Sequence, residues 1–225
     1  MSMKHLLETL FRIALFAFTL FFWSWVLHRP FSHIANLSII VGGVLLVFPV
    51  VCIGRMILDK RPTPARTDWT TTFVHFALMI LLGAAIIRAV VTRNDWLGWT
   101  LPNIGVIGWV LLILTGAFSL LTVVNLALRG LGAPFAISLS RRLAVDWLYA
   151  WTRNPMVLAT LAFLVALGIW FRSALFVAWV LLLFTPALLT FVKVYEEREL
   201  EIRFGASYLE YKSKTPLLFP RRPRD

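Results

Sequence analysis

The chain has 225 residues, of which 60% are hydrophobic and only 15% are charged, and its formal net charge is +11. Soluble globular domains are about half apolar and a quarter charged, so this composition excludes an ordinary soluble enzyme and indicates an integral membrane protein. In a membrane protein, the positive charge is better explained by the excess of Lys and Arg in cytoplasmic loops and by attraction to anionic lipid head groups than by binding of nucleic acid. The single cysteine, Cys52, excludes an internal disulfide, and no metal site is expected from the residue spacing.

Six apolar runs predict an all-α membrane helix bundle, with about six transmembrane helices and a cytoplasmic amphipathic segment at its C-terminal end. The runs cover residues 10–27, 37–53, 71–91, 104–128, 156–171 and 173–194. The fifth run would form a helix only ~24 Å long, shorter than the ~30 Å hydrocarbon core, so it tilts little, thins the bilayer or turns back. Pro186 is expected to kink the sixth helix. We expect one membrane domain over residues 1–225, with three helices in 1–103 and a functional core in 104–225.

The basic residues orient this bundle. With the N-terminus in the cytoplasm, 18 of the 22 Lys and Arg residues fall on the inside, and four fall outside: Arg29, Arg88, Arg93 and Arg172. Cytoplasmic loops of membrane proteins carry such an excess. The sequence therefore predicts that both termini are cytoplasmic, in a cell inner membrane.

An acidic cluster follows the sixth run directly, where lysine or arginine is the usual anchor. Five of the eleven acidic residues lie here: Glu196, Glu197, Glu199, Glu201 and Glu210. A carboxylate at the membrane boundary suits a cationic amino group, although neighbouring helical side chains point about 100° apart and cannot both face one groove. The alternative is a solvated helix stabilised by a pair of Glu199 with Arg203.

A second motif, Arg153-Asn154-Pro155, precedes the fifth run. Proline fits the first turn of a helix and asparagine can cap it, which leaves N–H groups that could bind an anion. Arg153 adds a forked cation suited to a carboxylate or phosphate. The alternative is a capped helix with an arginine that snorkels to the interface.

Two further features lie in the predicted cytoplasmic segments. Gly130 and Gly132 could let the backbone approach a ligand closely, or simply end the fourth helix. Gly205 is expected to end a helix. Tyr208 and Tyr211 lie three residues apart on one face of a short helix, where they could close over an adenine ring or sit at the interface as belt aromatics.

The order of these motifs resembles the isoprenylcysteine carboxyl methyltransferase and phospholipid methyltransferase superfamily. The resemblance covers about residues 130–220: a Gly-x-Gly-x-Pro turn, the stretch LAVDWLYAWTRNPM, a hydrophobic hairpin, and Glu196-Glu197 followed by Leu200, Phe204, Gly205, Tyr208, Tyr211, Pro216 and Pro220. It implies a membrane-embedded S-adenosylmethionine-dependent methyltransferase. In this family the hairpin ends and the C-terminal segment enclose the cofactor, and a lipid or prenyl-like substrate enters from the bilayer.

Carried over by position, the resemblance implies a cofactor site made of Gly130, Gly132, Arg153, Asn154, Pro155, Glu196, Glu197, Tyr208 and Tyr211. Arg153, Asn154 and Asp146 are the expected catalytic residues, with Asp146 or a glutamate assisting proton removal from an ammonium acceptor. The chain departs from the family at Asn154, where His is frequent, at Trp147 and Ala150, where Gly and Arg are common, and at Val157, where Tyr is common.

The methyl acceptor is left open by the sequence. Asn154 favours N-methylation of a phospholipid amine, whereas the lack of a strong general base favours a prenylcysteine carboxylate or a small thiol. An NADPH-dependent sterol-type reductase is a second class, disfavoured because residues 156–171 contain no acidic residue. A non-catalytic scaffold or a transporter is the third, for which only His75, Arg88 and Asn125 are candidate midplane polar residues.

Overall fold

The computed structural model describes residues 3–60, 62–96, 99–130 and 142–223. All named elements in this part of the chain are helical, which confirms the predicted all-α class. Five helical segments are long and apolar enough to cross a membrane: Leu7–His28, His33–Lys60, Pro64–Val91, Val106–Leu128 and Ala174–Phe204. A sixth apolar helix, Pro155–Trp170, is shorter. Each of the six predicted runs overlaps one of these segments.

The chain divides into two compact units. The first unit contains the chain up to Thr92 together with Ala187–Ile202, and the second contains most of the remainder, including the C-terminal residues from Arg203 onward.

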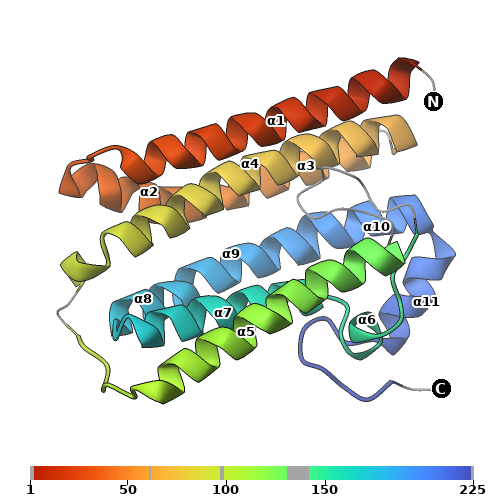
Figure 1. The fold of residues 1–225 in the computed structure, drawn as a ribbon. Coiled ribbons are helices and arrows are strands. Elements are labelled where there is room, and N and C mark those ends of the chain that lie inside the picture. The colour runs from red at the N-terminus through yellow and green to blue at the C-terminus, as the bar shows by residue number, and fades with distance from the viewer. Residues whose placement is uncertain (1–2, 61, 97–98, 131–141, 224–225) are drawn as a thin grey trace. The chain divides into compact units, whose positions relative to one another are not determined.

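Four helices make up most of the first unit: α1 (Met3–His28), α2 (His33–Leu45), α3 (Val47–Lys60) and α4 (Pro64–Val91). Helix α4 packs against the other three, and α1 runs beside it (Figure 1). Thr63 caps α4 by accepting from the N–H of Arg66 at 3.4 Å. The second predicted run is interrupted at Leu46, because Pro49 has no N–H to donate to the preceding turn.

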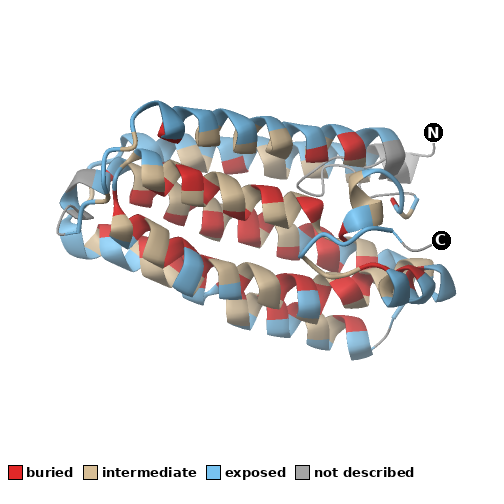
Figure 2. Ribbon diagram, turned by 90° about the horizontal axis from the view of Figure 1, so that it is seen from below, coloured by how far each residue is buried: buried red, intermediate tan, exposed pale blue. Residues whose placement is uncertain are grey.

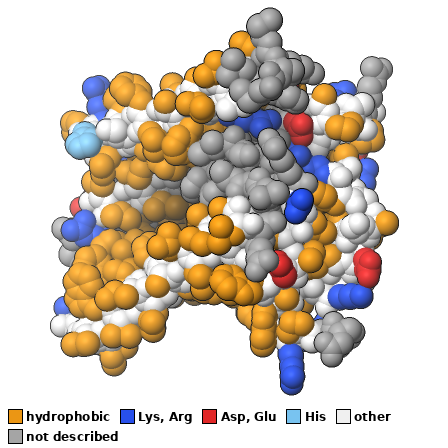
Figure 3. All heavy atoms as spheres, turned by 45° about the vertical axis from the view of Figure 1, so that its right-hand side comes forward, with side chains coloured by type: hydrophobic (Ala, Val, Ile, Leu, Met, Phe, Trp, Pro, Cys, Tyr) orange, Lys and Arg blue, Asp and Glu red, His pale blue; other side chains and the backbone are white. Residues whose placement is uncertain are grey.

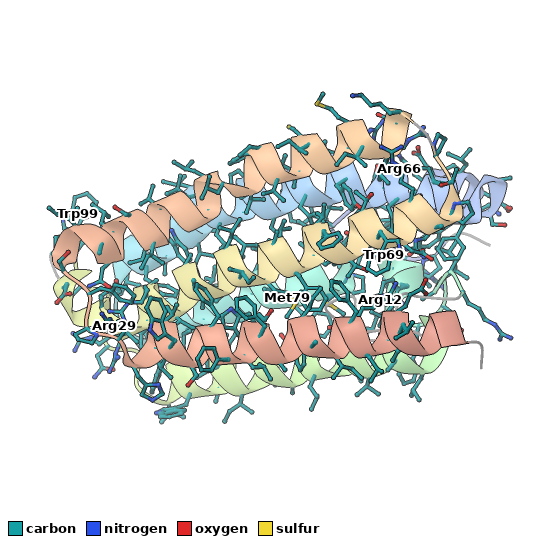
Figure 4. All side chains as sticks on the ribbon, turned by 90° about the horizontal axis from the view of Figure 1, so that it is seen from above. Arg12, Arg29, Arg66, Trp69, Met79 and Trp99 are labelled. Atoms are coloured by element: carbon teal, nitrogen blue, oxygen red, sulfur yellow. The ribbon has the colours of Figure 1, made fainter. Side chains whose placement is uncertain are left out.

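An indole ring joins α1 to α4. Trp23 Nε1 donates to the carbonyl oxygen of Met79 at 3.1 Å, and Figure 4 shows Met79 on the side of α4 nearest α1. The same ring covers Gly83, where an added Cβ would lie 2.4 Å from the indole. The glycine is therefore required by close packing.

Arg88 joins the ends of three helices in the first unit. It is buried, and its Nε donates to Asn36 Oδ1 at 2.7 Å. Its Nη1 donates to the carbonyl oxygens of Val26 at 2.9 Å and Arg29 at 3.3 Å. The guanidinium also lies 5.0 Å from the ring centroid of Phe31. Arg88 is thus held by α1, α2 and the turn between them.

The second unit is built around α5 (Val106–Asn125) and α7 (Pro155–Trp170), which pack along each other. A short π-helix, η2 (Leu126–Gly130), continues α5. After the short helix η1 (Arg93–Trp96), the chain is tied to the turn that follows α7. There the N–H of Leu101 donates to the carbonyl oxygen of Arg172 at 2.8 Å, and that of Ala174 donates to Trp99 at 3.1 Å.

The last apolar run is not a plain α-helix. It consists of α8 (Ala174–Trp179), the π-helix η4 (Val180–Phe184), α9 (Thr185–Thr190), the π-helix η5 (Phe191–Glu196) and α10 (Glu197–Phe204), before the separate helix α11 (Ala206–Lys214). Pro186, the expected kink site, is the second residue of α9, two positions after the end of η4. Just before it, Thr185 donates both its N–H and its Oγ1 to the carbonyl oxygen of Val180. The missing proline N–H thus coincides with a local change of helix type.

The helices carry buried residues along one side and exposed residues along the other (Figure 2). Many exposed side chains are large and apolar, such as Phe21, Val106 and Leu182. Hydrophobic side chains cover much of the face seen in Figure 3. Such surfaces suit contact with lipid, and they support the membrane assignment.

Candidate functional site

The predicted site residues fall in both units. Glu196 and Glu197 belong to the first unit, whereas Asp146, the Arg153-Asn154-Pro155 motif, Tyr208 and Tyr211 belong to the second. Gly130 is the last residue of η2. Gly132 lies outside the residues that the structure describes.

In the second unit, the residues before α7 are fastened to the C-terminal segment. The N–H of Arg153 donates to the carbonyl oxygen of Pro216 at 2.9 Å. The carbonyl oxygen of Leu217 accepts from Asn154 Nδ2 at 2.9 Å and from Thr152 Oγ1 at 3.2 Å. The N–H of Arg221 donates to the carbonyl oxygen of Trp151 at 3.0 Å. Two motifs that lie over sixty residues apart in the sequence therefore meet here.

Asn154 does not do what the sequence predicted. It stands at the N-cap position of α7, and Pro155 is the first helical residue as expected, but the Asn154 side chain makes no capping hydrogen bond. Its amide nitrogen donates to Leu217 instead. The side chain thus ties down the C-terminal segment, and the first N–H groups of α7 are left without a side-chain cap.

The two tyrosines lie together on α11, as predicted. Their ring centroids are 6.3 Å apart and both side chains are buried, which does not fit belt aromatics at a membrane surface. Tyr211 donates its hydroxyl to the carbonyl oxygen of Tyr149 at 2.7 Å. Burial raises the pKa of Tyr211 above its usual range, Tyr149 adds to the rise, and Arg153 opposes it. Tyr211 is therefore a protonated donor at neutral pH and not a base.

Asp146 lies at the surface of the second unit. It is exposed, and its carbonyl oxygen accepts from the N–H of Tyr149 at 3.1 Å, at the start of the short helix α6 (Leu148–Trp151). This bond positions the backbone of the motif. Proton removal by the Asp146 carboxylate stays a prediction.

Three helices begin after residues with nearly the same backbone conformation. Gly105 precedes α5 with φ 49° and ψ −118°, and Gly205 separates α10 from α11 with φ 53° and ψ −127°. Trp147 precedes α6 with φ 57° and ψ −123°. Positive φ favours glycine, because it crowds a Cβ against the backbone. Trp147 is therefore strained where the resembled family commonly has glycine.

Replacing Trp147 with glycine is expected to stabilise the protein by up to about 1.5 kcal/mol. Relief of the strained φ stabilises the folded state by ~1–2 kcal/mol. The greater conformational freedom of glycine in the unfolded chain offsets ~0.5–1 kcal/mol of this gain. Thermal unfolding in detergent measures the difference. Trp151→Gly, inside α6, is the matched control and should destabilise. A Trp147→Gly protein that melts below the parent would contradict the strain.

The acidic cluster in the first unit is partly buried. Glu197 is 9% exposed and Glu199 is 6% exposed, while Glu196 is half-buried. The expectation of solvated side chains is therefore wrong for Glu197 and Glu199, whereas the pairing of Glu199 with Arg203 stays a prediction. The π-helix η5 ends just before Glu197, and its wider turns shift the following side chains relative to an α-helical pattern. Sequence periodicity gave no signal for the burial of Glu199.

An ion-pair network fastens this acidic segment to α3. Asp59 accepts from Arg55 Nε at 2.6 Å and from Arg198 Nε at 2.8 Å. Arg55 Nη1 also donates to the carbonyl oxygen of Val194 at 3.0 Å. Arg198 pairs with Glu201 at 3.4 Å. Arg55 and Asp59 carry no signal in the sequence for this role, since only the fold brings α3 beside η5.

Among the described residues, no group of three or more His, Cys, Asp or Glu side chains is arranged to hold a metal ion. No protein-family model, curated protein or solved structure matches this chain.

Proposed function

We propose that this protein is an integral membrane methyltransferase that uses S-adenosylmethionine to methylate a lipid or lipid-like amphiphile. The observation that carries the proposal is the set of hydrogen bonds between residues 151–154 and the C-terminal segment. The two segments that these bonds join contain two of the motifs by which the sequence resembles the isoprenylcysteine carboxyl and phospholipid methyltransferases. In the proposed topology both termini are cytoplasmic, in a cell inner membrane.

The residues of the second unit have the chemistry to hold such a cofactor. Arg153 carries a planar cation suited to a carboxylate, and its Nε and Nη1 atoms are buried. The N–H groups at the start of α7 favour an anion, and Tyr208 and Tyr211 offer buried ring surface. In this proposal Gly130 and Gly132 let the backbone approach the cofactor.

When bound, S-adenosylmethionine supplies an electrophilic methyl group on a sulfonium. The protein has to align the acceptor with that methyl and exclude water. An ammonium acceptor must first lose a proton, for which Asp146 or a nearby glutamate is the proposed base. We favour the amine of a phospholipid head group as the acceptor, with a prenylcysteine carboxylate or a small thiol as the alternative.

Calorimetric titration of the detergent-purified protein tests the cofactor. We expect S-adenosylhomocysteine to bind and NADPH not to bind. Binding of NADPH alone would favour the sterol-type reductase. Binding of neither would favour a scaffold or a transporter.

The planar guanidinium group of Arg153 is expected to be required for cofactor binding. Arg153→Ala should lose affinity for S-adenosylhomocysteine, and Arg153→Lys should not restore it, because a point charge cannot match a carboxylate at two atoms. The same titration measures both variants. Full affinity in the lysine variant would mean that Arg153 only snorkels to the interface.

Radiolabelled S-adenosylmethionine identifies the acceptor class. Purified protein is incubated either with phosphatidylethanolamine liposomes or with a farnesylcysteine analogue, and label is expected in the liposomes. Label in the analogue alone would refute phospholipid methylation and leave methyl transfer intact. Label in neither, despite tight S-adenosylhomocysteine binding, would point to another amphiphile.

A further inference from the structure

Asn125 is a buried amide whose hydrogen bonds are not made within the described structure. The residue is fully buried, and both Oδ1 and Nδ2 are without a hydrogen-bond partner. Its polar neighbours on α5 are satisfied within the helix: Thr115 Oγ1 donates to the carbonyl oxygen of Leu111, and Thr122 Oγ1 to that of Ser119, each at 2.7 Å. Such an amide is rare in proteins, because buried polar groups are nearly always paired.

The position of Asn125 follows from the packing of α5 against α7. Gly108, Thr122 and Asn125 are the buried residues of α5, and α7 is the helix that packs along it. Gly108 lies against Trp170, and Gly116 lies against Phe163, so the two helices run in opposite directions. Continuing this register brings Asn125 level with the first turn of α7.

Two further features lie at this level in the second unit. The N–H groups that open α7 have no side-chain cap, since Asn154 donates to Leu217 instead. Asn125 is also the last residue before the π-helix η2. Single turns of π-helix are found frequently at functional sites, because they re-aim side chains at a local cost in stability.

We infer that Asn125 binds the amino-acid end of the cofactor, an inference that rests on the proposed function. An unpaired amide needs a ligand that both accepts from Nδ2 and donates to Oδ1. A zwitterionic α-amino carboxylate does both, and its carboxylate also suits the open N–H groups of α7. Asn125 is then a cofactor-binding residue inside the membrane helices, in a position that no motif of the resemblance includes.

Asn125→Leu tests this inference, because leucine has the same branched arrangement of heavy atoms as asparagine and lacks both polar atoms. We expect the affinity for S-adenosylhomocysteine to fall at least about tenfold, as for the loss of hydrogen bonds to charged groups. The affinity for 5′-methylthioadenosine, which lacks the amino-acid end, should change less than about threefold. Thr115→Val, whose hydroxyl bonds only within α5, is the matched control and should bind both ligands as the parent does.

Thermal unfolding without ligand supplies a second readout. Because the amide is unpaired there, Asn125→Leu should melt at the same temperature as the parent or higher. A clear fall in melting temperature, or an equal loss of affinity for both ligands, would overturn the inference. Unchanged S-adenosylhomocysteine binding in the variant would also overturn it and leave the proposed function standing. If the parent binds no S-adenosylhomocysteine, the proposed function fails, and the ligand assigned to Asn125 falls with it.

Discussion

Arg88→Met is expected to lower the free energy of unfolding in detergent by about 3 kcal/mol, from the loss of hydrogen bonds by a buried charged group. The substitution leaves Asn36 Oδ1 and the carbonyl oxygen of Val26 buried without their donor. It also removes the cation that lies over Phe31. Thermal or denaturant unfolding of the purified protein measures the loss.

Arg29→Met is the matched control for this prediction. Arg29 is exposed and contributes only its backbone carbonyl to the Arg88 cluster, which the substitution preserves. Its side chain lies near the Trp25 ring, a contact worth about 0.5–1 kcal/mol at an exposed site. If both variants melt alike, Arg88 does not anchor the ends of α1, α2 and α4.

Glu197→Gln is expected to weaken S-adenosylhomocysteine binding at least about tenfold, because a desolvated hydrogen bond to a charged group is worth ~1.5–3 kcal/mol. The sequence pairs Glu197 with Glu196 for this role, and the structure buries Glu197 more deeply. Glu199→Gln belongs in the same series, since Glu199 is also buried. Calorimetric titration compares the variants under one set of conditions.

Glu210→Gln is the appropriate control for the glutamate series. Glu210 is exposed and pairs with Lys214 at 2.9 Å, which lowers its pKa through that hydrogen bond. Glu201 would serve less well, because it pairs with Arg198 in the network around Asp59. If Glu196→Gln, Glu197→Gln and Glu199→Gln all keep the parent affinity, the acidic segment does not hold the amino group.

The helices could be predicted from the sequence because a membrane imposes one simple pattern. Each predicted run has a helix in the structure, and turn signals such as Ser32 and Thr63-Pro64 mark where α2 and α4 begin. The run from residue 71 was predicted too short, since the polar first turns of α4 interrupt its hydrophobicity. The break at Leu46 could have been inferred from Pro49.

The candidate site could be predicted from the sequence only in part. The position of Pro155 in the first turn and the pairing of Tyr208 with Tyr211 follow from local rules. The burial of Glu199 depends on the π-helix η5, which has no periodic signature in the sequence. The bonds from residues 151–154 to the C-terminal segment use mostly backbone groups, which any sequence possesses. Side-chain types therefore reveal the motifs, but not what they bond to.

The Arg88 cluster also bears on the order in which the chain is made. The acceptors of its guanidinium described above come from residues synthesised earlier, with Asn36 preceding it by 52 positions and Val26 by 62. An arginine without partners is costly to place within a bilayer, and partners from neighbouring helices reduce that cost. Here α1 and α2 leave the ribosome first, so α4 reaches the membrane after the groups that receive its charge. Helices α1 and α2 can in this way provide, in advance, the hydrogen-bond acceptors against which α4 assembles.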